Sequence, residues 1–130
     1  QAGVVELVSE LGHEVRDLGP VDTTSVDYPD FAHAVARAVE TGEAERGILV
    51  CGTGIGMSLA ANRHPQVRAA LCHDAFTAEM ARCHNDANVL CIGSRSTGPG
   101  VAEQIVRIFL ETSFEGGRHQ RRVEKIEREG

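Results

Sequence analysis

The sequence predicts a single α/β domain over residues 1–130, with a three-layer, Rossmann-like (doubly wound) parallel sheet covered by helices on both faces. Short apolar strands alternate along the chain with helices, an order that requires parallel strands joined by crossover helices. The strands are apolar throughout, as in sheets that are buried on both faces. We expect four strands, at 13–18, 47–50, 67–72 and 88–92. One more is expected before residue 1, because the chain opens on a helix and such sheets normally begin with a strand.

Apolar periodicity and turn residues place the helices between these strands. The expected helices are 4–11, 31–41, 56–62, 75–83 and 99–110. Gly12 and Gly42 end the first two, as glycine commonly does after a helix, and Asp74 caps the start of the fourth. Residues 112–130 form an arginine-rich tail.

Composition and charge exclude several classes of function. A net charge of −6 argues against broad nucleic-acid binding, which needs a basic surface. No apolar run approaches the roughly 20 residues that span a bilayer, so no membrane association is expected. The four cysteines show no CxxC spacing, which disfavours a zinc ribbon or a redox motif. Reduced thiols in an α/β domain are typical of a cytoplasmic protein.

The stretch CGTGIGMS follows the apolar strand at 47–50 and is the strongest candidate for a site. Ligands of open α/β sheets bind at the carboxyl ends of strands. Glycines there let backbone N–H groups approach an anion, and the field of the following helix would favour a thiolate at Cys51. The stretch matches neither the Walker A motif nor GxGxxG. The alternative is a tight strand-to-helix turn with an inert cysteine.

Two polar stretches are weaker candidates. His84 opens the run HNDAN before the last strand, where it could act as a general acid or base, or belong to a capped turn. Cys72-His73 and Cys83-His84 could together hold a metal, but the short ligand spacing typical of such sites is absent.

The tail carries a basic cluster in an acidic protein. If the tail is helical, Arg118 and Arg122 share a face and could clamp a phosphate. The alternative is a solvated helix. Arg95, after the last strand, is a further candidate for an anion contact.

Together these stretches resemble the ribose-5-phosphate isomerase B family, which includes the galactose-6-phosphate isomerase subunits. The matching segments, in family order, are DYPD at 27–30, GILVCGTGIGMS at 47–58, AAN at 60–62, HNDANVL at 84–90 and FEGGRH at 114–119. The resemblance implies an aldose–ketose isomerase that needs no metal or cofactor and acts on ribose 5-phosphate through a cis-enediolate. It implies that Cys51 is the base, that Thr53 shuttles a hydroxyl proton and that His84 helps to open the sugar ring.

The resemblance also implies how the substrate is held. The glycine loop would bind the enediolate, through Gly52, Gly54, Ile55, Gly56 and Ser58. Asn85 would contact the sugar, and Arg95, Arg118 and Arg122 would engage phosphate or sugar oxygens. The partner is a second copy of the chain, in a homodimer or a dimer of dimers whose active sites are shared between subunits.

Two alternatives stay open at this point. The same chemistry could act on another sugar phosphate, such as allose or galactose 6-phosphate or a tetrose phosphate. Family members begin with a first strand and a loop carrying an Asp-His pair, and Gln1 enters the first helix directly. If those residues are truly missing, we expect a weak enzyme or a non-catalytic sugar-phosphate-binding module.

Overall fold

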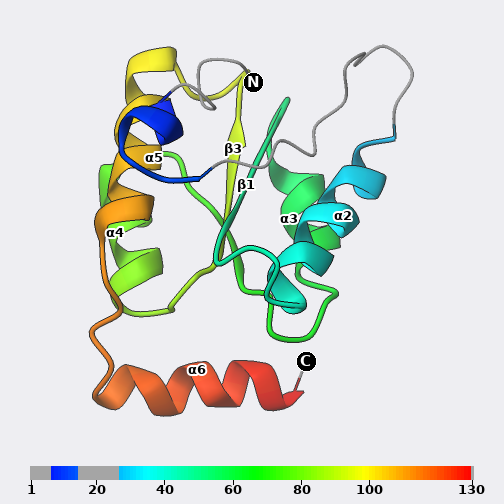
Figure 1. Cartoon of the computed structure of the whole chain (residues 1–130), viewed down its shortest axis with the longest axis vertical. Helices are drawn as coiled ribbons and strands as arrows, with labels where there is room; N and C mark the ends of the chain where they lie inside the picture. Colours follow the sequence, from blue (N-terminus) through cyan, green and yellow to red (C-terminus); the bar gives the residue numbers. More distant parts are fainter. Residues whose placement is uncertain (1–6, 15–26, 130) are drawn as a thin grey trace.

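The computed structural model describes residues 7–14 and 27–129, with side chains to residue 127. A parallel sheet lies between two layers of helices (Figure 1). A helical turn at 7–10 packs with α4 and α5 on one face, and α2 and α3 cover the other (Figure 1). The elements are α2 (Tyr28–Glu40), β1 (Gly47–Cys51), α3 (Ile55–Ala61), β2 (Ala69–Leu71), α4 (Ala75–Cys83), β3 (Val89–Gly93), α5 (Pro99–Glu111) and α6 (Arg118–Glu129).

The described strands run in the order β1-β3-β2, so β3 is central. Gly47 pairs with Val89 at one end of β1, and Cys51 pairs with Gly93 at the other. All five residues of β3 are buried, which explains why the sequence of this strand is apolar throughout. The carboxyl ends of the strands therefore meet at one edge of the sheet, which we call the carboxyl edge, and their starts meet at the amino edge.

Alternate side chains of β3 enter two separate cores, as the period of a strand requires. Leu90 and Ile92 pack against α4 and α5, where Phe109 is fully buried. Val89 and Cys91 pack on the opposite face, against α2 and α3. The two cores fix the helices on either side of the sheet and so fix both edges.

The fold class predicted from the sequence is confirmed, and most elements lie within a residue or two of their predicted bounds. One difference is α2, which begins at Tyr28 because Pro29 occupies its first turn. The strand predicted at 13–18 lies largely in 15–26, outside the described residues. None of the helices in the described part is long and apolar enough to cross a membrane.

The strand predicted at 67–72 is shorter than expected, and side-chain hydrogen bonds lie at its start. The Arg68 N–H donates to Asn88 Oδ1 at 2.8 Å and not to a strand carbonyl. Asn62 occupies both backbone groups of Ala69, at 2.7 and 2.9 Å. These bonds fix the start of β2, which has three residues, Ala69–Leu71.

The tail at 118–129 is helical, and α6 lies across the amino edge of the sheet (Figure 1). An ion pair between Arg68 and Glu127 ties the end of α6 to the start of β2. Glu127 also accepts a hydrogen bond from the Gln66 N–H at 3.2 Å. Val123 is buried beneath the helix. The arginine cluster of the tail is thus held at the edge opposite to Cys51.

Candidate active site

Cys51 is the last residue of β1 and is half-buried at the start of the glycine loop. The segment after β3 supports this loop through two backbone hydrogen bonds. The Ser94 N–H donates to the Cys51 carbonyl at 2.7 Å, and the Arg95 N–H donates to the Gly52 carbonyl at 2.9 Å. The loop therefore sits at the carboxyl edge between two neighbouring strands, where ligands of parallel sheets bind.

Two of the three glycines of the loop, Gly54 and Gly56, are required by close packing, whereas a Cβ on Gly52 would meet Arg95 only at ordinary contact distances. Gly54 has φ +78°, and a Cβ there would lie 2.6 Å from Leu71 Cδ1 and 3.1 Å from the Ile92 carbonyl carbon. A Cβ on Gly56 would collide with the ring of Tyr28. Gly54 is itself buried, so the packing supports the structural interpretation at these two glycines, and anion binding by the backbone of the loop stays a prediction.

The remaining predicted residues at the carboxyl edge differ in their exposure and in their hydrogen bonds. Arg95 and Thr53 are exposed, and the side chain of Arg95 lies 3.6 Å from where a Gly52 Cβ would be. Ile55 is 52% exposed at the start of α3. The Ser58 hydroxyl donates to the Ile55 carbonyl at 2.7 Å, so its proton is used within the helix. Arg95 is thus the one charged side chain, among these, that the fold brings to the glycine loop.

A second group of predicted residues lies at the amino edge. His84 caps the end of α4, with its N–H donating to the Met80 carbonyl at 2.9 Å. Asn85 is exposed beside it, and Arg118 and Arg122 are exposed on α6. These four residues belong to one region of the molecule, because the segment before α6 returns to α4: the Glu115 N–H donates to the Cys83 carbonyl at 3.0 Å.

Some residues of the run HNDAN at 84–88 stabilise a turn, and others are candidates for a catalytic or binding role. Asp86 accepts from Arg82 at 2.9 Å and pairs with Arg68 at 3.4 Å, and Asn88 holds the backbone of Arg68. These residues stabilise the turn. The side chains of His84 and Asn85 form no hydrogen bond with Arg68, Arg82, Asp86 or Asn88. They are therefore available to a ligand.

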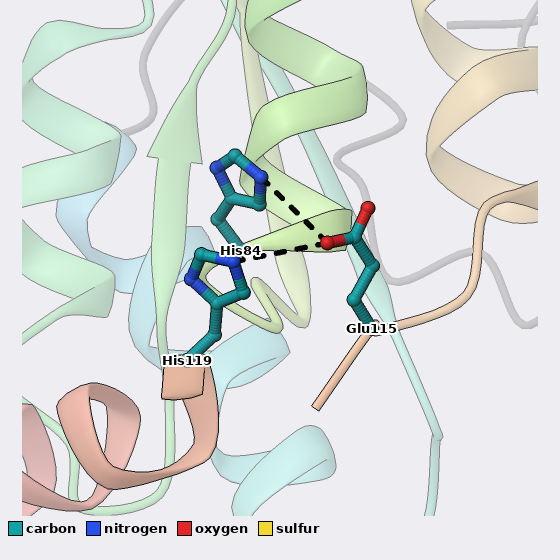
Figure 2. A group of neighbouring side chains, drawn as sticks. All are labelled: His84, Glu115 and His119. Carbon is teal, nitrogen blue, oxygen red and sulfur yellow. Dashed lines mark ion pairs between the residues drawn. The ribbon is translucent and has the colours of Figure 1, made fainter. Parts of the chain in front are cut away.

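His84 lies in a cluster that includes two residues absent from the predicted site. The rings of His84 and His119 stack with centroids 4.1 Å apart and planes 14° apart. Both Nε2 atoms face Glu115 Oε1, at 3.9 Å from His84 and 3.7 Å from His119 (Figure 2). His119 is buried, and burial, followed by the charges of His84 and Arg118, lowers its pKa. Both residues stand in the segment FEGGRH, but Glu115 precedes α6, so no helical spacing in the sequence marks this pair.

The two groups lie at opposite edges of the sheet. Cys51 pairs with the last residue of β3, whereas His84 precedes the first. Five residues of strand separate these ends by about 13 Å. Cys51 and His84 of one chain therefore do not face a single small substrate.

The other cysteines are in different environments from Cys51. Burial raises the pKa of Cys72 to about 11 and that of Cys91 to about 12, so both stay protonated at neutral pH. The pKa of Cys83 is also raised, first by desolvation and then by Glu115. Within the described residues, the group of three or more potential metal ligands that comes together is His84, Glu115 and His119, without Cys72 or Cys83.

Comparison with known proteins gives this arrangement a family. Residues 1–126 match the sequence profile of the family described as ribose/galactose isomerase. The chain belongs to this family of isomerases. Ribose-5-phosphate isomerase B of Escherichia coli is 47% identical over 123 residues, 95% of this chain and 83% of that protein. D-erythrulose-4-phosphate isomerase of Pectobacterium atrosepticum is 48% identical over 99 residues, 76% of this chain and 65% of that protein.

A solved structure agrees with the sequence relatives. The type B ribose 5-phosphate isomerase of Trypanosoma brucei superposes with a TM-score of 0.96 at 53% identity, over 99% of this chain and 89% of that one. This chain is thus an aldose–ketose isomerase of the ribose/galactose isomerase family, with the family's single-domain fold.

Proposed function

We propose that this isomerase interconverts ribose 5-phosphate and ribulose 5-phosphate, with Cys51 as the base. The observation that carries the proposal is the position of Cys51 at the carboxyl edge, half-buried at the start of the glycine loop. The names of the Escherichia coli and Trypanosoma brucei relatives support ribose 5-phosphate as the substrate. The four cysteines are free, which fits a cytoplasmic enzyme.

The reaction moves one proton between two carbons. The Cys51 thiolate removes the proton on C2 of the open-chain aldose, and the electron pair of that bond forms a C1–C2 double bond. The C1 carbonyl oxygen becomes an oxyanion, and the proton of the C2 hydroxyl passes to it by way of Thr53. The Cys51 thiol then returns its proton to C1, which leaves a carbonyl at C2 and restores the thiolate.

Backbone amides of the loop at 52–56 lower the barrier to this transfer. A proton on carbon leaves readily only if the developing oxyanion is stabilised at the same time. Amides held in place by neighbouring backbone pay no reorganisation cost during the reaction. The anchoring of the loop through the Cys51 and Gly52 carbonyls supplies that rigidity.

The site takes residues from two copies of the chain. His84, which helps to open the sugar ring, lies at the edge opposite to Cys51 of its own chain. Asn85, Arg118 and Arg122 lie at the same edge as His84. The proposed contacts to the sugar and the phosphate therefore come from the same subunit as His84. A homodimer, alone or within a dimer of dimers, would bring the amino edge of one subunit to the carboxyl edge of another. The carboxyl edge would keep Arg95 as its own anion contact.

Mixing two inactive variants tests this sharing. We expect Cys51→Ala and His84→Ala each to be impaired alone, and mixed dimers, isolated by two different affinity tags on the co-expressed chains, to recover about half of the wild-type activity. Every dimer that carries both tags is mixed, and one of its two sites is intact. The measurement is kcat per site in the doubly purified mixture. Activity no higher than that of the separate variants would show that both residues act within one chain.

The substrate is tested with a panel of sugar phosphates. We expect kcat/KM to be highest for ribose 5-phosphate, at least tenfold above that for allose 6-phosphate and for tetrose 4-phosphates, since one added or missing carbon group is worth about 10–200-fold in a fitted pocket. The tetrose phosphate is the second candidate, because of the Pectobacterium atrosepticum relative. A higher kcat/KM for D-erythrulose 4-phosphate would select that activity instead.

The same assays, run in deuterated water with the wild type alone, test whether the proton moves through an enediolate. Deuterium at C2 of recovered aldose supports the enediolate, and transfer without any exchange would point to a hydride shift or to a proton that is fully shielded from solvent.

A further inference from the structure

The cluster of His84, Glu115 and His119 has the composition of a metal site as well as that of a hydrogen-bonded network. It combines two imidazoles and one carboxylate, a donor set that binds Zn²⁺ in enzymes with an open fourth position. The three residues come from the end of α4, the segment before α6 and the first turn of α6 (Figure 2). Their potential ligand atoms all lie within 4.8 Å of one another.

The distances suit a single small cation. Zn–N and Zn–O bonds are about 2.0–2.2 Å long, so donors around one tetrahedral ion lie about 3.4 Å apart. Glu115 Oε1 lies 3.9 Å from His84 Nε2 and 3.7 Å from His119 Nε2. These two separations exceed the requirement by less than an ångström, and all three donor atoms lie within 4.8 Å of one another. Binding one ion requires the two stacked rings to rotate apart, so that both nitrogen lone pairs converge on it. The stacked rings present both nitrogens toward the same carboxylate oxygen (Figure 2).

The surroundings combine one fixed ligand with two adaptable ones. The side chain of His119 is only 10% exposed, whereas those of His84 and Glu115 are 37% and 57% exposed. Backbone hydrogen bonds hold all three segments, including Glu115 to Cys83 at 3.0 Å and His119 to Gly116 at 3.0 Å. An ion can therefore enter from solvent without unfolding a helix.

The charges around the cluster partly oppose a cation and partly favour it. Arg118 and Arg122 act on His119 and would repel a dication. Glu115 offsets one of these charges. The balance favours a reversible site of moderate affinity over a permanent structural one.

We propose that His84, Glu115 and His119 bind one Zn²⁺ ion and that this binding inhibits the isomerase. The inhibition rests on the proposed function of His84: an imidazole whose Nε2 holds a metal has no lone pair with which to take a proton from the sugar. The metal is an inhibitor here and takes no part in the reaction.

Binding is measured first, without substrate, by competition of the metal-free full chain with a zinc-chelating dye. We expect one equivalent of Zn²⁺ to bind the wild type, and His119→Asn and Glu115→Gln each to weaken binding by at least about tenfold. His33→Asn is the matched control. His33 and His64 form a second pair of histidines beside a glutamate, Glu40, but the two imidazoles are hydrogen-bonded directly to each other at 2.6 Å.

Cysteine must be excluded as the ligand. Cys51→Ser should bind Zn²⁺ as the wild type does, and a Co²⁺-loaded sample should lack thiolate-to-metal charge-transfer absorption. Binding that is absent from the wild type, unchanged in both ligand variants or lost in Cys51→Ser would overturn the site.

Inhibition is measured next, each variant being compared with its own metal-free rate. We expect Zn²⁺ to inhibit the wild type reversibly on addition of a chelator, and His119→Asn to need at least about tenfold more Zn²⁺. Equal inhibition of the wild type and His119→Asn would overturn the inhibitory role. A metal-free wild type without isomerase activity would instead refute the proposed function, and the binding result would stand.

Discussion

Replacing Cys51 with alanine is expected to lower kcat/KM for ribose 5-phosphate by about 10²–10⁴-fold, the usual contribution of a positioned general base. The variant keeps the glycine loop, its anchoring hydrogen bonds and both edges of the sheet, because those bonds use only the backbone of Cys51. The loss should therefore appear mainly in kcat. Steady-state kinetics, with circular dichroism to show an unchanged fold, provide the measurement.

Cys72→Ala is the matched control for this experiment. Cys72 is a buried thiol whose pKa burial raises to about 11, so it supplies no base at neutral pH. Its removal leaves a small cavity in the core between the sheet and α5, and we expect lower stability with kcat/KM within about twofold of the wild type. Wild-type turnover in Cys51→Ala, or an equal loss in both variants, would contradict the assignment of the base.

The carboxyl-edge half of the site could be predicted from the sequence because it is local. Strand, cysteine, glycine loop and helix follow one another within residues 47–61, and the rule for parallel sheets places such a loop at the carboxyl ends of the strands. The packing reason for Gly54 could not be predicted. It depends on Leu71 and Ile92, which come from two other strands.

The amino-edge half was expected only through the family resemblance, which assigned His84 and Asn85 to a site shared between subunits. A helix that follows a strand in a parallel sheet returns to the starting edge, so His84, after α4, has to lie opposite to Cys51. That inference was within reach of the sequence. The contact of His84 with Glu115 and His119 was not, because it requires the tail to turn back across α4.

One buried charged group lies outside what the sequence analysis addressed. Arg82, near the end of α4, is 4% exposed. It donates to the carbonyls of Ala87 and Thr112 and to Asp86, which satisfies the buried charge. The same bonds shape the turn before β3 and present His84 and Asn85 outward. Long-range side-chain bonds of this kind leave no periodic signal in a sequence.

Gly54→Ala is expected to lower the free energy of unfolding by about 2–4 kcal/mol, since a left-handed residue with a Cβ is strained and the new methyl overpacks its surroundings. At φ +78° the Cβ would lie 2.6 Å from Leu71 Cδ1 and 3.1 Å from Ile92 carbonyl carbon. Leu71 can move, but the backbone of the central strand cannot, so the loop must shift. Urea unfolding at equal protein concentrations measures the loss.

Gly100→Ala separates this effect from a general effect of glycine replacement. Gly100 lies in the first turn of α5, and a Cβ there would meet nothing within 4 Å. We expect this variant to be as stable as the wild type or more stable by up to about 1 kcal/mol, because alanine loses less backbone entropy on folding. An equal loss of stability in both variants would contradict the packing role assigned to Gly54.

The activity of Gly54→Ala, measured where the variant is still folded, then distinguishes the two interpretations of the loop. If its amides hold the enediolate, displacing them should lower kcat by about 10²–10³-fold, as the loss of one oxyanion donor does in other enzymes. The Michaelis constant should change less, because the oxyanion develops only in the transition state. A destabilised variant with wild-type kcat would mean that the glycines serve packing against β2 and β3, and that other groups stabilise the charge created by Cys51.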